Sequence, residues 1–324
     1  VVAGTSTVAA ESVGVPLWTL PYTGQHHASR VASVALLLGA AAANAVVAAD
    51  LAVSVSGGSV VVVRGGFGVS AVGGVGSYGP GSSMSMSGAV AVVLHGATVN
   101  VTLDRVARFP LSAGGCGIAG IGVMTNATVD ARALALQLLA ARTSFNVVGH
   151  ATVAVALGAI AAGEPIRLDS IIVDTGATVT LGSLEAAAIN GTTIRVRGDF
   201  EALGVLGVAA SSLDRGRRAL VTDATVALVN SAVDVAGVDV SGFAVLGAAG
   251  FFLRASVASF NATVIGSIIN VTMIGGGGIY SAGIAAGIGA NRRTHVGTVA
   301  GWVADTHISV RTSGIVSGLG VGGI

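Results

Sequence analysis

The stretch Gly96-Ala-Thr-Val-Asn-Val-Thr-Leu103 has the pattern of a β-strand entered through a glycine turn. Its apolar residues alternate with polar ones, as in a strand that buries one face and exposes the other. The phrase Ala-Thr-Val returns after other turn-forming or polar residues, with copies starting at Ala97, Ala127, Ala151, Ala177, Ala224 and Ala262. Three of the five gaps between these starts are 24, 26 and 30 residues, and this spacing predicts a solenoid with roughly 24 residues per coil.

Two kinds of segment support this prediction. Alternating, strand-like stretches lie at residues 178–181, 193–197, 233–236, 270–273 and 307–311. Segments rich in glycine, alanine and aliphatic residues lie between them, at residues 117–123, 202–208, 243–249 and 283–289. One coil alone cannot bury its inward residues, but coils stacked about 4.8 Å apart can. We therefore predict an all-β fold, a right-handed parallel β-helix of about a dozen coils and roughly 60 Å in length.

The first part of the chain departs from the pattern. Residues 1–49 are predicted to be an irregular or partly helical N-terminal cap or lead-in, because Pro16, Pro21 and Trp18 interrupt any regular alternation. Within it, residues 31–49 are expected to form a buried helix or a pair of coils. Residues 50–324 form the predicted solenoid, which we expect to be a fragment of a longer chain. A further segment, residues 131–142, has a composition typical of a short helix or a cap insertion.

The composition is unusual for a soluble domain. Of 324 residues, 50 are glycine, 52% are hydrophobic and only 10% are charged, and all sixteen cations are arginine. The net charge is +1, and no arginine cluster exceeds those at residues 215–218 and 292–293. Nucleic-acid binding normally requires a basic face, so it is not expected.

The high hydrophobicity leaves an integral membrane protein as one alternative. The best candidate span is residues 31–49, whose nineteen residues fit the length of a membrane helix. Ten of them are alanine or glycine and no aromatic residue flanks them, which favours burial within the protein.

Five Asn-x-Ser/Thr sequons occur, at Asn100, Asn126, Asn190, Asn261 and Asn270. Such sequons are the acceptor sites of N-linked glycans in secreted proteins, and their number favours an extracellular glycoprotein. The alternative is that these asparagines form turns or stacked ladders along the coils.

Catalytic, metal and cofactor sites are not predicted. The acidic residues are isolated along the chain, at Asp169, Asp174, Glu185, Asp199 and Glu201, whereas Asp234 and Asp239 occupy outward phases of their strands. The histidines form no metal-binding pattern, and Cys116 is expected to be a small buried residue. A β-helix lyase or hydrolase acting on polysaccharide would need clustered carboxylates, and such an enzyme stays an alternative.

The repeated strand openings, the glycine-rich second element, the sequons and the absence of lysine resemble the large repetitive surface glycoproteins of kinetoplastid and euglenozoan protists. The resemblance covers about residues 50–320. It implies an extracellular, glycosylated protein with an adhesive or coat-forming role.

Together these observations lead us to expect a structural protein of the cell surface. We expect a building block of a fibre, a flagellar hair (mastigoneme) or a coat, which associates with itself or with related subunits. Its expected partners are those subunits and N-linked glycans, without a nucleic acid or a small-molecule substrate.

Overall fold

The computed structural model describes a chain built from strands. It describes residues 1–11, 34–41, 45–65, 69–77, 83–103, 115–123, 128–149, 153–162, 166–168, 171–173, 178–198, 201–211, 218–237, 241–250, 254–274, 280–289, 294–313 and 317–322. Within these ranges the fold is all-β, with 27 strands and no helix. The all-β prediction is therefore confirmed.

Two large sheets contain eight parallel strands each. Sheet I consists, in spatial order, of β1 (Thr7–Glu11), β5 (Val60–Gly65), β9 (Thr98–Leu103), β12 (Ser144–Gly149), β17 (Thr193–Gly198), β20 (Ala232–Gly237), β23 (Ile268–Ile274) and β26 (His307–Ser313). Sheet II consists of β2 (Val34–Ala41), β6 (Val69–Ser77), β10 (Gly115–Val123), β13 (Val153–Ala162), β18 (Glu201–Ser211), β21 (Ser241–Gly250), β24 (Tyr280–Gly289) and β27 (Ser317–Gly322).

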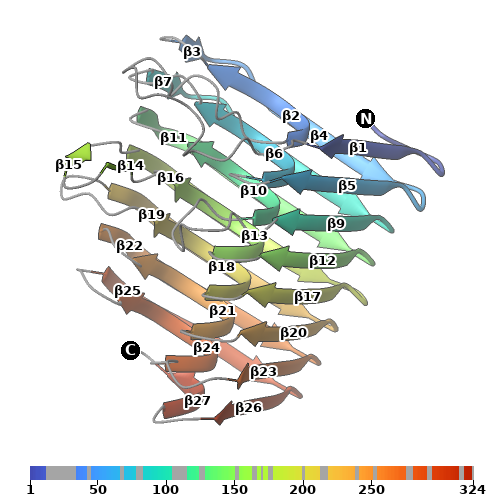
Figure 1. Cartoon of the computed structure of the whole chain (residues 1–324), viewed down its shortest axis with the longest axis vertical. Coiled ribbons are helices and arrows are strands. Elements are labelled where there is room, and N and C mark those ends of the chain that lie inside the picture. The colour runs from blue at the N-terminus through green and yellow to red at the C-terminus, as the bar shows by residue number, and fades with distance from the viewer. Residues whose placement is uncertain are drawn as a thin grey trace.

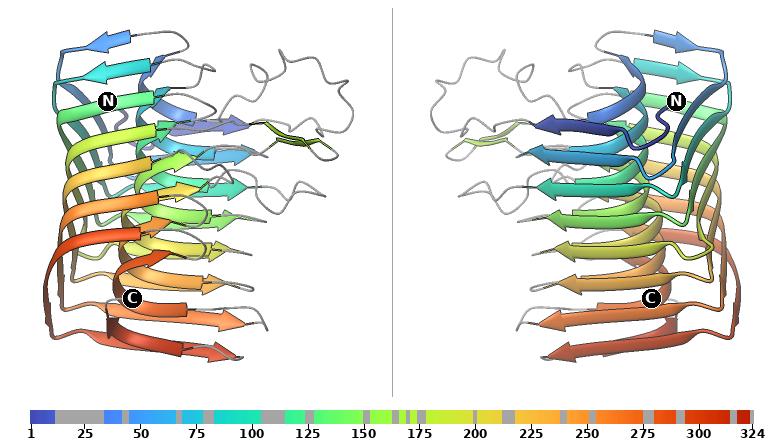
Figure 2. Two further views of the ribbon diagram at one scale, coloured as in Figure 1. Left: turned by 90° about the vertical axis from the view of Figure 1, so that its left-hand side faces the viewer. Right: turned by 90° about the vertical axis from the view of Figure 1, so that its right-hand side faces the viewer.

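Sheet III is the nine-stranded sheet, and its strands are also parallel. Its path runs through β25 (Thr294–Ala304), β22 (Arg254–Ile265), β19 (Arg218–Val229), β16 (Thr178–Ile189) and β11 (Thr128–Ala141). Beyond β11 the sheet continues as two shorter rows, β7 (Ser83–Met86) with β3 (Ala45–Val47), and β8 (Val90–His95) with β4 (Leu51–Ser56). A separate antiparallel pair, β14 (Ile166–Leu168) and β15 (Ile171–Val173), stands away from the large sheets (Figure 2).

The chain visits the three large sheets in rotation. After β16 in sheet III come β17 in sheet I, β18 in sheet II and then β19, which returns to sheet III beside β16. Each strand therefore pairs with strands one rotation earlier and one rotation later, and the strands stack from the N-terminal to the C-terminal end of the molecule (Figure 1). Each rotation supplies the backbone hydrogen bonds that its neighbour lacks.

The register corrects the predicted length of the repeat. The corner residues that precede the sheet I strands bond to their equivalents one rotation later. The number of residues between two such partners is therefore the length of one rotation. Thr143 and Thr192 are 49 residues apart, Ser231 and Ser267 are 36 apart, and Ser267 and Thr306 are 39 apart. The prediction of roughly 24 residues per coil was therefore wrong. Eight strands in sheet I also mean seven spacings of about 4.8 Å, or roughly 34 Å of stack rather than 60 Å.

The Ala-Thr-Val phrase gave a wrong period because it occurs in all three sheets. The copy at Ala97 precedes β9 of sheet I, the copy at Ala151 precedes β13 of sheet II, and the copy at Ala177 precedes β16 of sheet III. Those at Ala224 and Ala262 lie inside β19 and β22. Distances between copies therefore mix steps within a rotation with steps between rotations.

The two segments for which a helix was one of the expected alternatives, residues 31–49 and 131–142, form strands in most of their described parts. Residues 131–141 belong to β11, in which Leu136, Leu138 and Ala140 are buried and Gln137 is exposed, so the side chains alternate with the period of a strand. Residues 34–41 and 45–47 form β2 and β3. The first strand, β1, pairs with β5 in sheet I, and residues 12–33 lie outside the described ranges.

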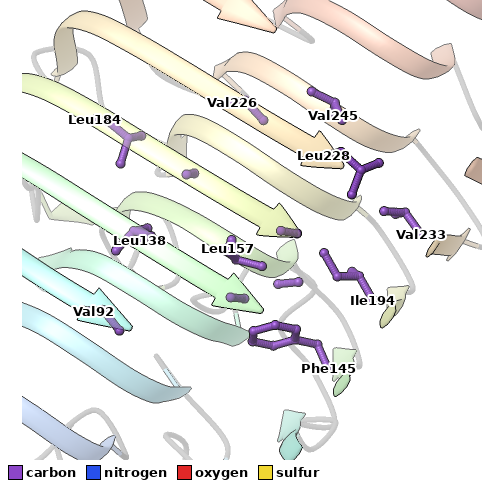
Figure 3. Packing of buried hydrophobic residues seen from close by; sticks show 14 of the residues in the cluster. Val92, Leu138, Phe145, Leu157, Leu184, Ile194, Val226, Leu228, Val233 and Val245 are labelled. Atoms are coloured by element: carbon purple, nitrogen blue, oxygen red, sulfur yellow. The ribbon is translucent and has the colours of Figure 1, made fainter. Parts of the chain in front are cut away.

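The core lies between the sheets and consists of columns of inward side chains. In sheet I one column runs through Val99, Phe145, Ile194, Val233 and Ile269, all at most 1% exposed. Several of these residues face Leu138, Leu157 and Leu228 from the other sheets (Figure 3). Complete burial of one such side chain contributes about 1.5–3 kcal/mol, so the columns account for most of the hydrophobic stabilisation.

The corner from sheet III to sheet I is built from a second repeated device. The first residue after the sheet III strand has a positive φ, at Gly96, Arg142, Asn190, Asn230, Gly266 and Asp305. A small inward residue comes next, directly in most rotations and after one further glycine, Gly191, in the rotation of Asn190. In five rotations this inward residue carries a hydroxyl group: Thr143, Thr192, Ser231, Ser267 and Thr306. The Oγ1 of Thr192 lies 2.8 Å from the carbonyl oxygen of Ile189 and 3.0 Å from that of Ala140, one rotation earlier.

This arrangement forms a hydroxyl ladder, which we define as Thr143, Thr192, Ser231, Ser267 and Thr306. The Oγ of Ser231 reaches Val229 and Ala188, and that of Ser267 reaches Ile265 and Leu228, in the same way. The ladder gives buried carbonyl groups a donor, and buried polar groups need such partners. It therefore ties consecutive rotations together at the corner.

Candidate functional site: the outer face of sheet I

The outer face of sheet I carries a column of polar side chains. The register places Asn100, Asn146, Arg195, Asp234, Asn270 and Ser309 on consecutive strands, each about 4.8 Å from the next. We call this set the polar column. Its members come from the outward positions of the alternating strands, whose inward positions carry the apolar core.

A neighbouring outward column lies two residues further along each strand. From β17 to β26 it contains Arg197, Ala236, Thr272 and Arg311. On the other side of the polar column, β17 and β20 present Thr193 and Ala232. The outward positions of β20 are thus alanine, aspartate and alanine, whereas β17 presents threonine and two arginines.

The small side chains of β20 leave an open hollow of about 500 Å³ in this face. We call it the sheet I hollow, and its polar lining is Thr193, Arg195, Asp234, Asn270, Thr272, Ser309 and Arg311. Ala232 lies in its floor. Two guanidinium groups and one carboxylate line it, so its formal charge is +2 − 1 = +1.

The charged groups of the hollow are available to a ligand. Among the described residues, Arg195, Asp234, Asn270 and Arg311 have no side-chain hydrogen bond or ion pair with one another or with any other described side chain. Arginine donates, aspartate accepts, and asparagine, serine and threonine do both. No aromatic ring lines the hollow, so recognition there depends on hydrogen bonds and charge.

A second hollow, of about 450 Å³, lies on the outer face of sheet III. Its lining includes Gln137, Glu185 and Asp223, and the amide Nε2 of Gln137 donates to Oε2 of Glu185 at 3.3 Å. Asp223 pairs in register with Ser183, two residues before Glu185. The register therefore brings two carboxylates to neighbouring strands, although they are far apart in the sequence. That proximity was missed because only the pairing of β16 with β19 creates it.

The sequons differ in their surroundings. Asn190 and Asn261 are exposed, Asn190 at the corner with a φ of 54° and Asn261 on the outer face of β22. Asn270 is exposed and lines the sheet I hollow, whereas Asn100 is half-buried in the polar column. The fifth, Asn126, lies outside the described residues. Glycosylation of these sites stays a prediction.

The other residues singled out from the sequence form no cluster where the structure describes them. Asp234 is exposed, as expected, and His95, His295 and His307 are exposed on separate strands. Cys116 lies in β10 and Glu201 begins β18, whereas Asp169, Asp174, Asp199 and Asp239 lie outside the described residues. In the described part of the chain no three histidine, cysteine or acidic side chains approach closely enough to hold a metal ion. Nor does that part contain an apolar helix long enough to cross a membrane.

Sequence reasoning also missed an apolar strip on β25. Val299 is 58% exposed and Trp302 is 65% exposed, and Val303 is also exposed. Val299 and Val303 continue inward columns whose preceding members, Phe260 and Val264, are buried. Val299 and Val303 are exposed because β25 has a sheet neighbour, β22, on one side only among the described strands, whereas Trp302 occupies the outward phase and pairs with Thr263.

Comparisons with known proteins identify no relative. No protein-family model, no curated protein and no solved structure matches this chain.

Proposed function

We propose that this chain is a right-handed parallel β-helix and serves as a structural segment of an extracellular glycoprotein. Such a protein would build a fibre, a flagellar hair or a cell-surface coat. The observation that carries the proposal is the repeated passage of the described strands through three parallel sheets, held by inward apolar columns and by the hydroxyl ladder. A stack of this kind transmits force through every level and resists bending.

The positions of the hydroxyl groups and of the sequon asparagines support a structural role. The buried hydroxyl groups of the ladder bond to backbone carbonyls, and the described sequon asparagines lie on the outside or at a corner. Glycans at such positions would cover a surface that has few charges of its own. This arrangement would keep the stack soluble while leaving its interior dry.

The exposed valines of β25 suit a further level of strands, supplied by a longer chain or by a related subunit. Exposed apolar side chains that continue a buried column are suited to being covered by another strand at the same spacing. Head-to-tail contacts generate open filaments when the rotation between subunits does not close into a ring, and an open filament is the assembly proposed here.

Electron microscopy of native material tests the proposal. Filaments or a regular coat, labelled by an antibody against this chain, are the expected result. A chain found as single particles within the cytoplasm would overturn it. Treatment with peptide N-glycosidase should lower the mass of the native protein, and an unchanged mass would overturn the glycoprotein assignment alone.

One observation favours a second candidate, an enzyme acting on polysaccharide. Glu185 and Asp223 share a hollow on neighbouring strands, and paired carboxylates are the catalytic groups of most glycosidases. Reducing sugar released from a panel of polysaccharides by the native chain, and lost in Glu185→Gln, would establish it. Equal release by both proteins would exclude this pair.

A further inference from the structure

The sheet I hollow contains a sequon asparagine among its lining residues. Asn270 is exposed there between Asp234 and Ser309, each one strand away. Neither Asn190 nor Asn261 lines this hollow or the hollow on sheet III. Asn270 therefore has a concave polar surface directly beside it.

The floor of the hollow leaves room for a ring. On β20 the outward residues beside Asp234 are Ala232 and Ala236, so nothing larger than a methyl group flanks that carboxylate on its own strand. Arg195 on β17 and Arg311 on β26 lie three strand spacings apart, roughly 14 Å across the strands, and Arg311 is offset by two further residues along its strand. A sugar ring attached to Asn270 can lie across β20 without displacing a side chain.

The chemistry of the lining complements such a sugar. N-linked glycans are attached through an N-acetylhexosamine, which has an amide carbonyl, an amide N–H and several hydroxyl groups. Arg195 and Arg311 can donate to its oxygens, and Asp234 can accept from a hydroxyl or the N–H group. These three side chains form no hydrogen bond or ion pair within the described part of the chain, so they are free to do so.

We propose that the sheet I hollow is the binding site for the first sugar on Asn270, so that this glycan lies against the sheet. Glycans on Asn190 and Asn261 instead extend into solvent. The proposal rests on the glycoprotein assignment made above. It adds that the glycan on Asn270 is held against the protein, and it names the side chains that hold it. The bound glycan would join β17, β20, β23 and β26 across the face of the stack.

The test is the rate at which peptide N-glycosidase releases each glycan from the native protein. The full chain is secreted from a eukaryotic host, and release is followed at each sequon by mass spectrometry of its peptides. We expect release at Asn270 to be about tenfold slower than at Asn190 and Asn261, because two or three hydrogen bonds to charged groups must break first. After the protein is denatured, the three rates should become equal.

Substitutions then test which side chains hold the sugar. The double variant Arg195→Ala with Arg311→Ala should bring release at Asn270 to within about twofold of the other sites. Arg197→Ala is the matched control, since Arg197 is an exposed arginine on β17 that does not line the hollow. It should leave the slow release unchanged. After complete deglycosylation, all variants should keep the thermal midpoint of the deglycosylated parent, because these side chains bond no other side chain in the described ranges.

The outcomes separate this inference from the glycoprotein assignment. A chain without any glycan overturns both. Glycan at Asn190 or Asn261 with none at Asn270 overturns only the inference, as does release at Asn270 that is as fast as elsewhere. Slow release that survives the double arginine substitution also overturns it, because the hollow would then not be the cause.

Discussion

At the corner between sheets III and I, single hydroxyl groups determine how one rotation is fixed to the next. Thr192 is fully buried, and its Oγ1 is within hydrogen-bonding distance of the carbonyls of Ile189 and Ala140. The same oxygen accepts from the backbone N–H of Thr143 at 3.4 Å. A methyl group in its place would leave these buried backbone groups without that partner.

Thr192→Val should therefore lower the free energy of unfolding by about 1–3 kcal/mol, the cost of leaving buried polar groups unsatisfied. The measurement is urea denaturation followed by circular dichroism. Thr193→Val is the control, because Thr193 has the same shape but is half-buried on the outer face. Equal stability of the two variants would show that the ladder does not stabilise the corner.

The positive-φ positions of the corner give a second prediction at this scale. Gly266 has a φ of 58°, and a Cβ built on it would meet Oδ1 of Asn230, the equivalent residue one rotation earlier. Gly266→Ala should cost about 1–2 kcal/mol from backbone strain alone, with the contact adding to it. Adding Asn230→Gly should recover the part of the lost unfolding free energy that is due to the contact, and the part due to backbone strain should remain. A double variant no more stable than Gly266→Ala would contradict this division.

At the scale of the element, alternation decides which face of a strand is buried. In β12, Phe145 and Val147 are fully buried, whereas Val148, one residue further on, is half-buried on the outside. Val147 and Val148 have the same side chain and differ only in which face of the strand they occupy, whereas Phe145 is both inward and larger. Their substitution should therefore have very different consequences.

Phe145→Ala should destabilise the protein by about 3–5 kcal/mol, because it leaves a cavity within the inward column. Val148→Ala should cost less than about 1 kcal/mol, because little buried volume is lost. Thermal unfolding of both variants checks the difference. Comparable losses would mean that β12 is not oriented as described.

At the scale of the whole molecule, the repeat is a rotation through three sheets and not a fixed length of chain. Rotations of 36 and 49 residues, measured between corner residues, both return the chain to the same position beside sheet I. The sequons, the hollow and the apolar strip are then arranged by level along the stack. Any change to the number of levels should preserve the fold if it removes one whole rotation.

Deletion of residues 232–267 tests the repeat. It joins Ser231 to Ile268, two positions that stand in the same relation as Ser267 and Ile268, and so removes one whole rotation. The product should fold, with a stack about 4.8 Å shorter by small-angle scattering. Deletion of residues 232–255, one coil of the length predicted from the sequence, should prevent cooperative folding because it joins sheet I to sheet III out of register. Folding of the 232–255 deletion together with unfolding of the 232–267 deletion would instead support a coil of about 24 residues.

The sequence by itself determined that the chain is made of strands and which side chains face inward. Alternation is a local property, because the residues next to a position indicate whether its side chain faces inward or outward. Val99 and Val101 are assigned inward in this way, and Asp234 and Thr272 outward. The composition of residues 131–141 did not identify their strand, because alanine and leucine are common in both helices and strands. Pairing with β8 and β16 on either side makes this segment a strand.

Only the tertiary structure decided the length of the rotation and which outward residues meet. Arg195, Asp234, Asn270 and Arg311 lie far apart along the chain, each about one rotation from the next, and pairing of β17, β20, β23 and β26 brings them together. The physical reason is that hydrogen bonds between parallel strands join residues one whole rotation apart. The number of residues in a rotation is the total of its strands and turns, and a local sequence pattern does not reveal that total.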